Sequence, residues 1–519
     1  MTRQFHIDQL EDHNGGWDIC VIGGGATGLG TAVDAASRGY KTILFEQYDF
    51  AKGTSSRSTK LVHGGVRYLQ QGNIKLVMDA LRERGTMKKN APHLVKNQSF
   101  IVPNYKWWEG PYYGLGLKVY DWMSGSLGLG SSEWLSTEQV LQLAPTLDPE
   151  GLRGGVVYHD GQFDDARLAI NLAQTAAEQG GTILNYFKLE GFLKQNQKIT
   201  GVEVSNTLNG SKYEIQCKTV VNATGVFSDS VQKLDDPDKK NTITPSQGIH
   251  IVLDKEFLPG DAAIMIPNTD DGRVLFAVPW HNKIIVGTTD TMVNTILEEP
   301  VAQEDEIDFI LQHAARYLTK DPSKEDVKSI FAGLRPLVKN TAKKTAEISR
   351  DHSILVSESG LISVLGGKWT TYRKMGEDVV NTAAIHARLP FTECVTTDLA
   401  IHGSENDVDF SAPGYYYGSD RSMLKKLMND DTNLSELLHP RLPYLAADII
   451  WAVRNEYCMT VEDALSRRTR ALLLDAVAAI KMAPRVAELM ANEMKLDEAW
   501  QKQQIEQFNI LAQHYLPRL

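Results

Sequence analysis

The chain has 519 residues, 42% of them hydrophobic, and a formal net charge of −11, which describes an ordinary globular protein large enough for two or three domains. The negative charge argues against nucleic acid as the main partner because phosphate backbones select basic surfaces, although it does not exclude a small anionic substrate. The four cysteines include no C-x-x-C pair, which indicates reduced thiols in a cytosolic protein and no metal site.

The first predicted unit is a strand, a glycine-rich turn and a helix. Residues 19–22 are apolar, a G-x-G-x-x-G motif follows, and residues 29–38 have the pattern of a helix. Such glycines allow a tight turn, close approach of a pyrophosphate and close helix packing, while the helix N-terminus attracts phosphate. A merely flexible loop would need neither these flanking elements nor the acid that ends the next strand, 42–45. The predicted dinucleotide contacts are Gly23, Gly25, Thr27, Gly28 and Glu46.

A dense run of hydroxyl groups and glycines follows at residues 54–69, and a helix is predicted at 74–89. Hydroxyls and backbone N–H groups suit a diphosphate and a ribityl chain, and the glycine pair at 64–65 suits close approach to a flat ring. The alternative is a polar surface loop, since serine and threonine runs are common in loops. The cofactor contacts predicted here are Thr54, Ser55, Thr59, Lys60 and His63.

Residues 105–129 are unusually rich in aromatic side chains, among them Trp107, Trp108 and Trp122. Such a segment could lie at a membrane interface or line an entrance for an apolar partner. The alternative is aromatic core packing with an interdomain lid, which the small number of basic residues favours.

The middle of the chain alternates short strands with single helices. A helix is predicted at 165–180, and the apolar strand at 218–222 ends in Asn-Ala-Thr-Gly, which suggests a strand returning beside the dinucleotide site with Gly225 near the cofactor. Residues 243–290 read as a second, largely antiparallel sheet that binds substrate. After a helix at 304–317, the buried strand 361–365 runs into Gly367 and a helix at 374–386, where a second helix N-terminus could face the cofactor.

Beyond about residue 400 the pattern becomes helical. Five helices are expected, at 422–428, 445–457, 460–468, 471–481 and 485–494, with Thr460 as a plausible N-cap. These residues predict a small helical domain, and the chain contains no internal repeat.

Taken together, the motifs resemble those of the flavin-dependent glycerol-3-phosphate dehydrogenases of the mitochondrial and aerobic bacterial type. The segments that carry the resemblance are 22–30, 55–69, 164–167, 222–225, 287–290, 333–336 and 366–373. They cover nearly the whole chain up to about residue 390, and 55–69 and 366–373 are the family-specific ones. The glycine motif alone is shared with many flavoproteins and NAD enzymes.

The resemblance implies an α/β fold with a Rossmann-like FAD-binding domain of the glutathione-reductase/D-amino-acid-oxidase type. A mainly antiparallel substrate domain and a C-terminal helical cap complete it. The first two domains are expected to interleave within residues 1–395. The FAD-binding domain would take mainly 16–100, 150–230 and 340–395, the substrate domain mainly 101–149 and 231–339, and the helical domain 396–519.

The activity implied is oxidation of sn-glycerol 3-phosphate to dihydroxyacetone phosphate, with a hydride passing from C2 to FAD. By the same resemblance, His250 is the expected base and Arg335 the second catalytic residue; His63 is the alternative base but more simply contacts the flavin. The phosphate would be bound by a cation cluster, and two further side chains would touch the substrate. The substrate contacts expected beside His250 and Arg335 are Arg67, Tyr68, Arg350, Lys368 and Thr370.

FAD is preferred over NAD because the hydroxyl-rich loop needs a long, extended cofactor and no second nucleotide motif follows a strand elsewhere. A quinone is the expected electron acceptor, and the protein is expected to be a homo-oligomer, most simply a dimer. No signal peptide or spanning segment is predicted, so we expect a cytoplasmic protein bound peripherally to the inner face of the membrane. The alternatives are an oxidase that uses O2, a non-catalytic flavin-binding protein and an amine oxidase.

Overall fold

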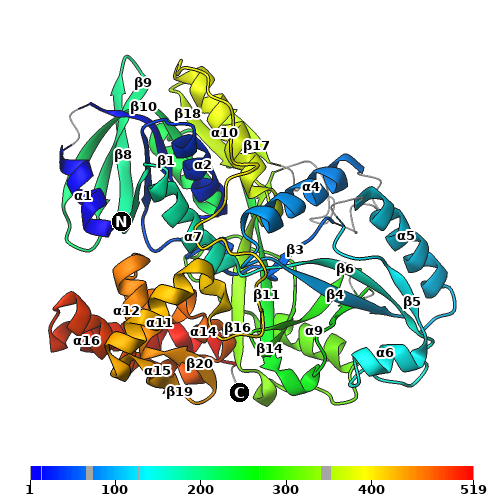
Figure 1. Ribbon diagram of the computed structural model, residues 1–519. Helices are drawn as coiled ribbons and strands as arrows, with labels where there is room; N and C mark the ends of the chain where they lie inside the picture. Colours follow the sequence, from blue (N-terminus) through cyan, green and yellow to red (C-terminus); the bar gives the residue numbers. More distant parts are fainter. Residues whose placement is uncertain are drawn as a thin grey trace.

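The computed structural model describes residues 2–12, 15–65, 74–124, 128–267, 269–270, 272–339 and 352–517. Two large sheets lie side by side, and the C-terminal helices, orange to red in Figure 1, pack below the first sheet and beside the second. This arrangement confirms the expected α/β architecture with an antiparallel second sheet and a C-terminal helical part.

The first sheet is the nucleotide-binding layer predicted from the glycine motif. Its five parallel strands run in the order β18-β10-β1-β2-β7, with β17 antiparallel at one edge and β8 and β9 extending β10. The strands are β1 Trp17–Ile22, β2 Thr42–Glu46, β7 Thr182–Asn185, β8 Phe187–Gln195, β9 Lys198–Asn206, β10 Lys212–Asn222, β17 Ser353–Val356 and β18 Leu361–Leu365. The central strands are buried because helices cover one face and a second apolar cluster covers the other.

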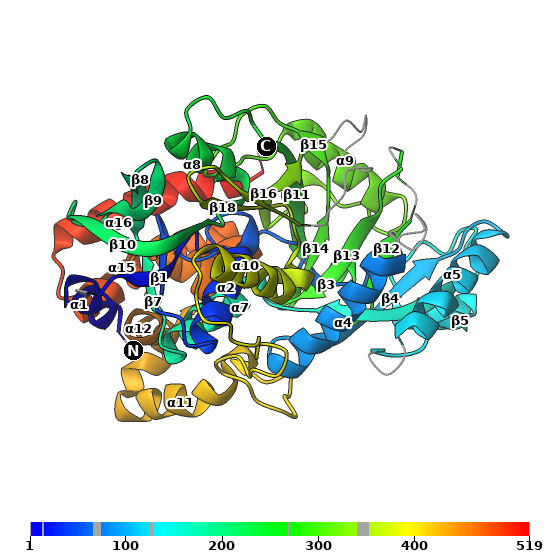
Figure 2. The same ribbon diagram turned by 90° about the horizontal axis from the view of Figure 1, so that it is seen from above.

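Glycines bring the helices onto this sheet. The helices are α1 Arg3–Asp12, α2 Ala26–Ser37, α7 Asp165–Glu178, α8 Ser228–Asp235 and α10 Tyr372–His386. A Cβ on Gly28 would lie 1.8 Å from the carbonyl oxygen of Gly23, so α2 can begin against the turn only with glycine there. Gly30 and Gly376 allow α2 and α10 to pack closely, because a Cβ on either residue would lie within 2.8 Å of the backbone of the other helix. Figure 2 shows α2 and α10 next to each other above β1.

The second sheet follows the order β15-β11-β14-β13-β12-β4-β6-β3, with β16 paired to β11 and β5 to β6. All its pairings are antiparallel except that of β4 with β12. The strands are β3 Leu61–Val62, β4 Lys96–Pro103, β5 Glu133–Leu135, β6 Gly155–Gln162, β11 Ile243–Asp254, β12 Ala263–Ile266, β13 Leu275–Trp280, β14 Lys283–Gly287, β15 Thr291–Met292 and β16 Ser329–Val338. Strands β3, β4 and β6 come from ranges expected in the FAD-binding domain, because an alternating pattern does not specify which sheet accepts a strand.

Four helices surround the second sheet: α4 Ile74–Asn90, α5 Glu109–Ser124, α6 Thr137–Leu143 and α9 Glu304–Ala315. The helices predicted at 74–89 and 304–317 correspond to α4 and α9. Among the described residues, no helix combines the length and the apolar character that crossing a bilayer would require.

The C-terminal part contains six α-helices among the described residues and one hairpin. They are α11 Arg421–Asp430, β19 Leu437–His439, β20 Leu442–Leu445, α12 Ala446–Asn455, α13 Val461–Asp463, α14 Ala471–Leu474, α15 Ala476–Met494 and α16 Glu498–Ala512. Thr460 caps α13 as predicted, accepting from the N–H of Asp463. The sequence analysis predicted two separate helices, at 471–481 and 485–494, whereas α15 continues without a break from one range into the other and includes Pro484. Burial of Ala483 and Val486 outweighs the one backbone hydrogen bond that proline cannot donate. The sequence analysis did not predict helix α16, because only Gln504, Phe508 and Ala512 of this helix are buried and the apolar pattern is therefore weak.

Buried ion pairs attach this C-terminal part to the first sheet. Asp49 follows β2 and accepts from Arg467 at 2.5 Å and from Arg468 at 2.6 Å, with all three side chains at most 3% exposed. Arg470 likewise lies 3.0 Å from Asp164, the N-cap of α7. Burial alone would raise the pKa of Asp49, but the two arginines lower it to about 2. A charge that is buried in this way stabilises the fold only while its partners are present.

We therefore expect Asp49→Asn to lower the free energy of unfolding by about 3–5 kcal/mol, because two buried guanidinium groups each lose one of their carboxylate partners. Thermal unfolding at pH 7 measures it, with Asp398→Asn as the control. Asp398 pairs with Lys89 at the surface, where both side chains are about two-thirds exposed, so its loss should leave the melting point nearly unchanged.

The difference between wild type and Asp49→Asn should shrink as the pH falls from about 4 to about 2, since the wild-type carboxylate is then protonated. Equal melting points for Asp49→Asn and Asp398→Asn would contradict the role of this cluster.

Candidate active site

A cavity of about 1050 Å³ lies at the carboxyl ends of β1, β2, β10 and β18 and continues across the second sheet; we call it the central cavity. The carboxyl end of a parallel sheet, where the strand order reverses around β1, is where such folds bind nucleotides. Its volume is at the upper end of the range of about 300–1,000 Å³ for ligand pockets, enough for a large cofactor with a small substrate.

The glycine turn and Glu46 form one wall of the central cavity. Gly23 has a φ of +109°, and a Cβ there would lie 2.7 Å from the carbonyl oxygen of Ala223. The carboxylate of Glu46 accepts from the N–H of Gly24 at 2.6 Å and from the N–H of Tyr48 at 2.9 Å. Burial raises the pKa of Glu46. These bonds fix the acid while leaving lone pairs that a ribose hydroxyl can use.

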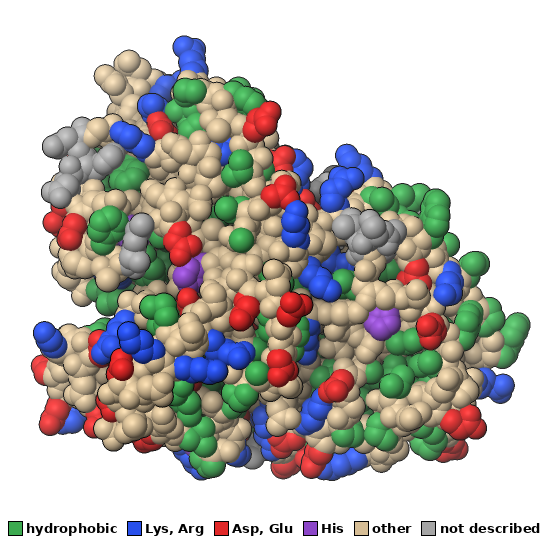
Figure 3. Space-filling view, viewed as in Figure 1, with side chains coloured by type: hydrophobic (Ala, Val, Ile, Leu, Met, Phe, Trp, Pro, Cys, Tyr) green, Lys and Arg blue, Asp and Glu red, His purple; other side chains and the backbone are tan. Residues whose placement is uncertain are grey.

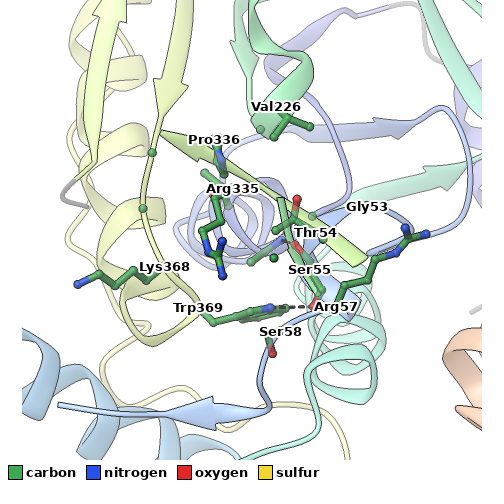
Figure 4. A pocket seen from close by; sticks show the side chains of 18 of the residues that line it. Gly53, Thr54, Ser55, Arg57, Ser58, Val226, Arg335, Pro336, Lys368 and Trp369 are labelled. Atoms are coloured by element: carbon green, nitrogen blue, oxygen red, sulfur yellow. Dashed lines mark hydrogen bonds between the residues drawn. The ribbon is translucent and has the colours of Figure 1, made fainter. Parts of the chain in front are cut away.

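The second wall comes from the ends of β10 and β18. The side chain of Asn222 accepts from both the N–H and the hydroxyl of Thr224 and donates to Ser363, which explains the Asn-Ala-Thr-Gly sequence as a locked turn. Gly367 has a φ of +98°. Trp369, which the sequence analysis did not single out, donates from its indole N–H to the backbone carbonyl of Ser55 at 2.8 Å and so joins the two halves of the wall (Figure 4).

His250 lies on the second sheet with its ring held on three sides. Its Nε2 is 2.9 Å from the hydroxyl of Thr59, its ring stacks on Phe331 with centroids 4.9 Å apart, and a Cβ on Gly287 would lie 2.3 Å from its Cδ2. Burial, and then Arg335 and Lys60, lower the pKa of His250 well below its usual value. The imidazole is therefore neutral near pH 7 and able to accept a proton.

Arg335 lies on the same face as His250, because β11 and β16 pair with His250 opposite Phe331 and Ser246 opposite Arg335. Its guanidinium donates to the hydroxyl of Thr288 and the carbonyl of Thr289, each at 3.0 Å, and lies 3.3 Å from Asp290. A charge in the otherwise apolar run of β16 needs a partner, and Asp290 is one. The side chain stays partly exposed and points toward the middle of the central cavity (Figure 4).

Lys60, expected to contact the cofactor, has different surroundings. Its ammonium group donates to both oxygens of Asp165, at 2.7 and 2.8 Å, and to the carbonyl of Ser56 at 2.6 Å. Burial lowers the pKa of Lys60 and raises that of Asp165, each against the pull of its partner. Among the described residues Lys60 is not part of the cavity wall, since its charge is used to hold the segment from Ser56 onward against α7.

Most of the other residues expected at the site do line the central cavity. They are Gly23, Gly25, Thr27, Glu46, Thr54, Ser55, Thr59, His63, Gly225, Gly367, Lys368, Thr370, His250 and Arg335. Gly28 packs against the turn instead. Arg67, Tyr68 and Arg350 lie outside the described residues. Whether each lining residue binds a ligand stays a prediction.

Asp160 is a lining residue that the sequence analysis missed. This buried carboxylate accepts from Arg84 of α4 at 2.8 Å and from Tyr120 of α5 at 2.9 Å, and the N–H of Gly64 is 3.3 Å away. A Cβ on Gly64 would lie 2.3 Å from the Tyr120 hydroxyl. Asp160 thus joins α4, α5 and the glycine pair of the loop, an arrangement that no local sequence pattern could reveal.

Helix α5 carries two opposite apolar stripes. Tyr113, Leu117 and Tyr120 are at most 8% exposed. Leu115 and Trp122, offset on the helix, are 70% and 83% exposed, and Trp107 just before the helix is 78% exposed. Figure 3 shows hydrophobic side chains gathering over this part of the molecule, at the right edge. The aromatic segment thus provides both core packing and an exposed apolar face.

The central cavity has an apolar arm that approaches this helix. It is lined by Leu61, Trp108, Tyr113, Met265, Val274 and Phe276. Trp108 lies just before α5 and Tyr113 lies on the buried stripe of this helix, so the arm reaches the buried side of α5. Among the described residues, no group of three or more His, Cys, Asp or Glu side chains is arranged to hold a metal ion.

Comparisons with known proteins agree over the whole length. A family model described as FAD dependent oxidoreductase matches residues 18–373, and one described as the C-terminal domain of alpha-glycerophosphate oxidase matches residues 394–501. The chain is 40% identical to the mitochondrial glycerol-3-phosphate dehydrogenase of Arabidopsis thaliana, covering 94% of this chain and 85% of that protein. It is 39% identical to the mitochondrial glycerol-3-phosphate dehydrogenase of Homo sapiens, covering 94% and 72%.

Solved structures give the same result for the fold. The glycerol-3-phosphate dehydrogenase from Bacillus halodurans, complexed with FAD, superimposes with a TM-score of 0.81 at 29% identity, covering 99% of this chain and 97% of that one. The L-alpha-glycerophosphate oxidase from Mycoplasma pneumoniae with FAD bound reaches a TM-score of 0.56 at 18% identity, covering 73% and 96%, which shows a similar fold alone.

Proposed function

The chain belongs to the FAD-dependent glycerol-3-phosphate dehydrogenases, and from that premise we propose that it oxidises sn-glycerol 3-phosphate to dihydroxyacetone phosphate and passes the electrons to a membrane quinone. The observation that carries the reaction is the placement of His250 and Arg335 on one face of the second sheet, facing the glycine turn across the central cavity.

FAD is the cofactor, and the cavity wall fits it. The amino end of α2, the turn at Gly23 and Gly25, and the fixed carboxylate of Glu46 suit a pyrophosphate and an adenosine ribose. The hydroxyls of Thr54 and Ser55 continue the wall toward the second sheet. When bound there, FAD supplies the hydride acceptor for C2 of the substrate.

Cationic side chains are proposed to bind the substrate's phosphate. Arg335 and Lys368 both line the central cavity, and Arg335 is oriented by Thr288, Thr289 and Asp290 so that its fork has a fixed direction. Charge-assisted hydrogen bonds contribute about 1.5–3 kcal/mol each, so two or three would favour glycerol 3-phosphate strongly over glycerol. His250, neutral and buried beside them, is proposed as the base for the C2 hydroxyl proton.

Replacing Arg335 tests this site. We expect Arg335→Ala to lower kcat/KM for glycerol 3-phosphate by about 100-fold or more, because the phosphate loses a charged donor, while FAD content stays the same. Arg82→Ala, which removes a surface guanidinium that is 68% exposed, is the matched control. An Arg335→Ala enzyme that turns over low concentrations of glycerol 3-phosphate at the wild-type rate would rule out the proposed phosphate site.

The quinone and the membrane are proposed from the apolar arm and the outer face of α5. A quinone head group is apolar and flat, and the arm lined by Met265 and Phe276, which reaches the buried side of α5, is the part of the central cavity that suits it. The exposed Trp107, Leu115 and Trp122 are the kind of side chains that enter the lipid headgroup region. We therefore propose that α5 lies on the inner face of the cytoplasmic membrane.

We expect the double variant Trp107→Gln/Trp122→Gln to bind liposomes more weakly and to lose most quinone reduction in liposomes, because apolar area that enters the lipid is removed. Reduction of the flavin by substrate should be unaffected. The matched control is Ile385→Gln/Phe391→Gln, which removes two side chains that are 81% exposed elsewhere. Liposome flotation and quinone reduction measure it, and equal flotation of both double variants would refute the membrane face.

An oxidase that passes electrons to O2 remains the second candidate, favoured by the match of residues 394–501 to a domain of alpha-glycerophosphate oxidase. Stoichiometric hydrogen peroxide per turnover, undiminished by quinone, would identify it. That the protein is a dimer stays part of the proposal.

A further inference from the structure

We propose that the hydroxyl of Thr59 relays the proton of the substrate's C2 hydroxyl to Nε2 of His250. Thr59 was expected from the sequence only as a cofactor contact. This inference rests on the proposed function, and it assigns Thr59 to the chemistry of the substrate.

Access to the imidazole is the first argument. His250 is only 3% exposed, and its Nδ1 is buried without a hydrogen-bond partner among the described residues. Its Nε2 is already 2.9 Å from the Thr59 hydroxyl. His250 also lines the central cavity, but its Nε2 is already in contact with Thr59, which is half-buried and lines the same cavity, so that a substrate would meet the Thr59 hydroxyl before Nε2.

The ring cannot easily turn to expose a nitrogen. Phe331 stacks on it with an angle of 16° between the ring planes, and the Cδ2 side faces Gly287 at a distance that leaves no room for a Cβ. A rotation about the Cβ–Cγ bond would move Nε2 away from Thr59 and, short of a half-turn, would also break the stacking. The geometry thus keeps Nε2 directed at one hydroxyl.

Thr59 is held equally firmly, by both of its neighbours. The N–H and hydroxyl of Ser58 donate to one oxygen of Asp165, at 3.1 and 2.7 Å, and the ammonium of Lys60 donates to both oxygens of the same carboxylate. All atoms of the Lys60–Asp165 pair are buried. This ion pair therefore fixes the backbone on either side of Thr59.

The charges around His250 keep it neutral until substrate arrives. Arg335 and Lys60 face it, paired with Asp290 and Asp165 respectively, and together with burial they disfavour the imidazolium. A phosphate dianion bound at Arg335 would offset that positive charge. Proton acceptance by His250 is thus coupled to binding of a phosphorylated substrate.

The step balances in protons and electrons. With the proton of the neutral imidazole on Nδ1, Nε2 accepts from the Thr59 hydroxyl. The C2 hydroxyl gives its proton to the oxygen of Thr59 while Thr59 gives its own proton to Nε2, so that Thr59 is unchanged and His250 becomes an imidazolium. The electron pair of the broken O–H bond forms the carbonyl as the C2 hydride leaves to the bound FAD. No other oxidant or co-reactant is required.

The test uses the FAD-loaded full-length protein and follows anaerobic bleaching of the flavin by glycerol 3-phosphate in rapid mixing. The variants are Thr59→Val, which keeps the shape without the hydroxyl, and Thr59→Ser, which keeps the hydroxyl. We expect Thr59→Val to slow bleaching at saturating substrate by about 100-fold and to change its pH profile. Thr59→Ser should recover to within about 10-fold of wild type, with FAD affinity unchanged in both.

A double-mutant cycle tests whether Thr59 acts through His250. If it does, Thr59→Val should slow bleaching little further when His250→Asn is already present. Full additivity of the two losses would overturn the relay. So would a Thr59→Val protein that binds FAD weakly but bleaches at the wild-type rate once loaded, since Thr59 would then be a cofactor contact. Failure of the proposed function looks different, because wild-type flavin itself would then not bleach.

Discussion

The pairing of β11 with β16 is the constraint on which the site depends. Its register sets His250 opposite Phe331 and Arg335 opposite Ser246, and it leaves Gly248 opposite Gly333 between them. A Cβ on Gly248 would lie 2.3 Å from the Arg335 guanidinium, so the glycine makes the space into which that side chain folds. A one-residue slip of β16 against β11 would turn Arg335 to the face opposite to that of His250.

The second requirement is that the second sheet meets the first at the carboxyl ends of the parallel strands. The parallel sheet presents the turn after β1 and the acid at the end of β2, and the buried Lys60–Asp165 pair anchors the segment that passes from this sheet to His250. The C-terminal arginines that bind Asp49 and Asp164 stabilise the same junction from outside. The central cavity thus lies between the two sheets, and buried ion pairs on both sides of it keep the sheets in place.

Features encoded in a few consecutive residues could be predicted from the sequence. The glycine motif, Glu46 and the Thr460 cap all depend on neighbours within a turn or one βαβ unit, and each was found where expected. Features that depend on distant partners could not. Lys60 was expected at the cofactor because nothing in its segment points to Asp165, which lies 105 positions later.

Asp160 shows the same limit, since its partners come from three separate elements. The two opposite stripes of α5 were likewise ambiguous in sequence, because aromatic residues suit both a core and a lipid surface. Family resemblance supplied the roles of His250 and Arg335, and the structure supplied the neighbours through which they would act.

The most direct test of the account is an anaerobic titration of the purified, FAD-loaded protein with sn-glycerol 3-phosphate, followed through the visible absorption of the flavin. The account predicts bleaching by about one equivalent of glycerol 3-phosphate per flavin, and no bleaching by glycerol or lactate at the same concentration. A flavin that stays oxidised in excess glycerol 3-phosphate, or that glycerol reduces equally well, would contradict it.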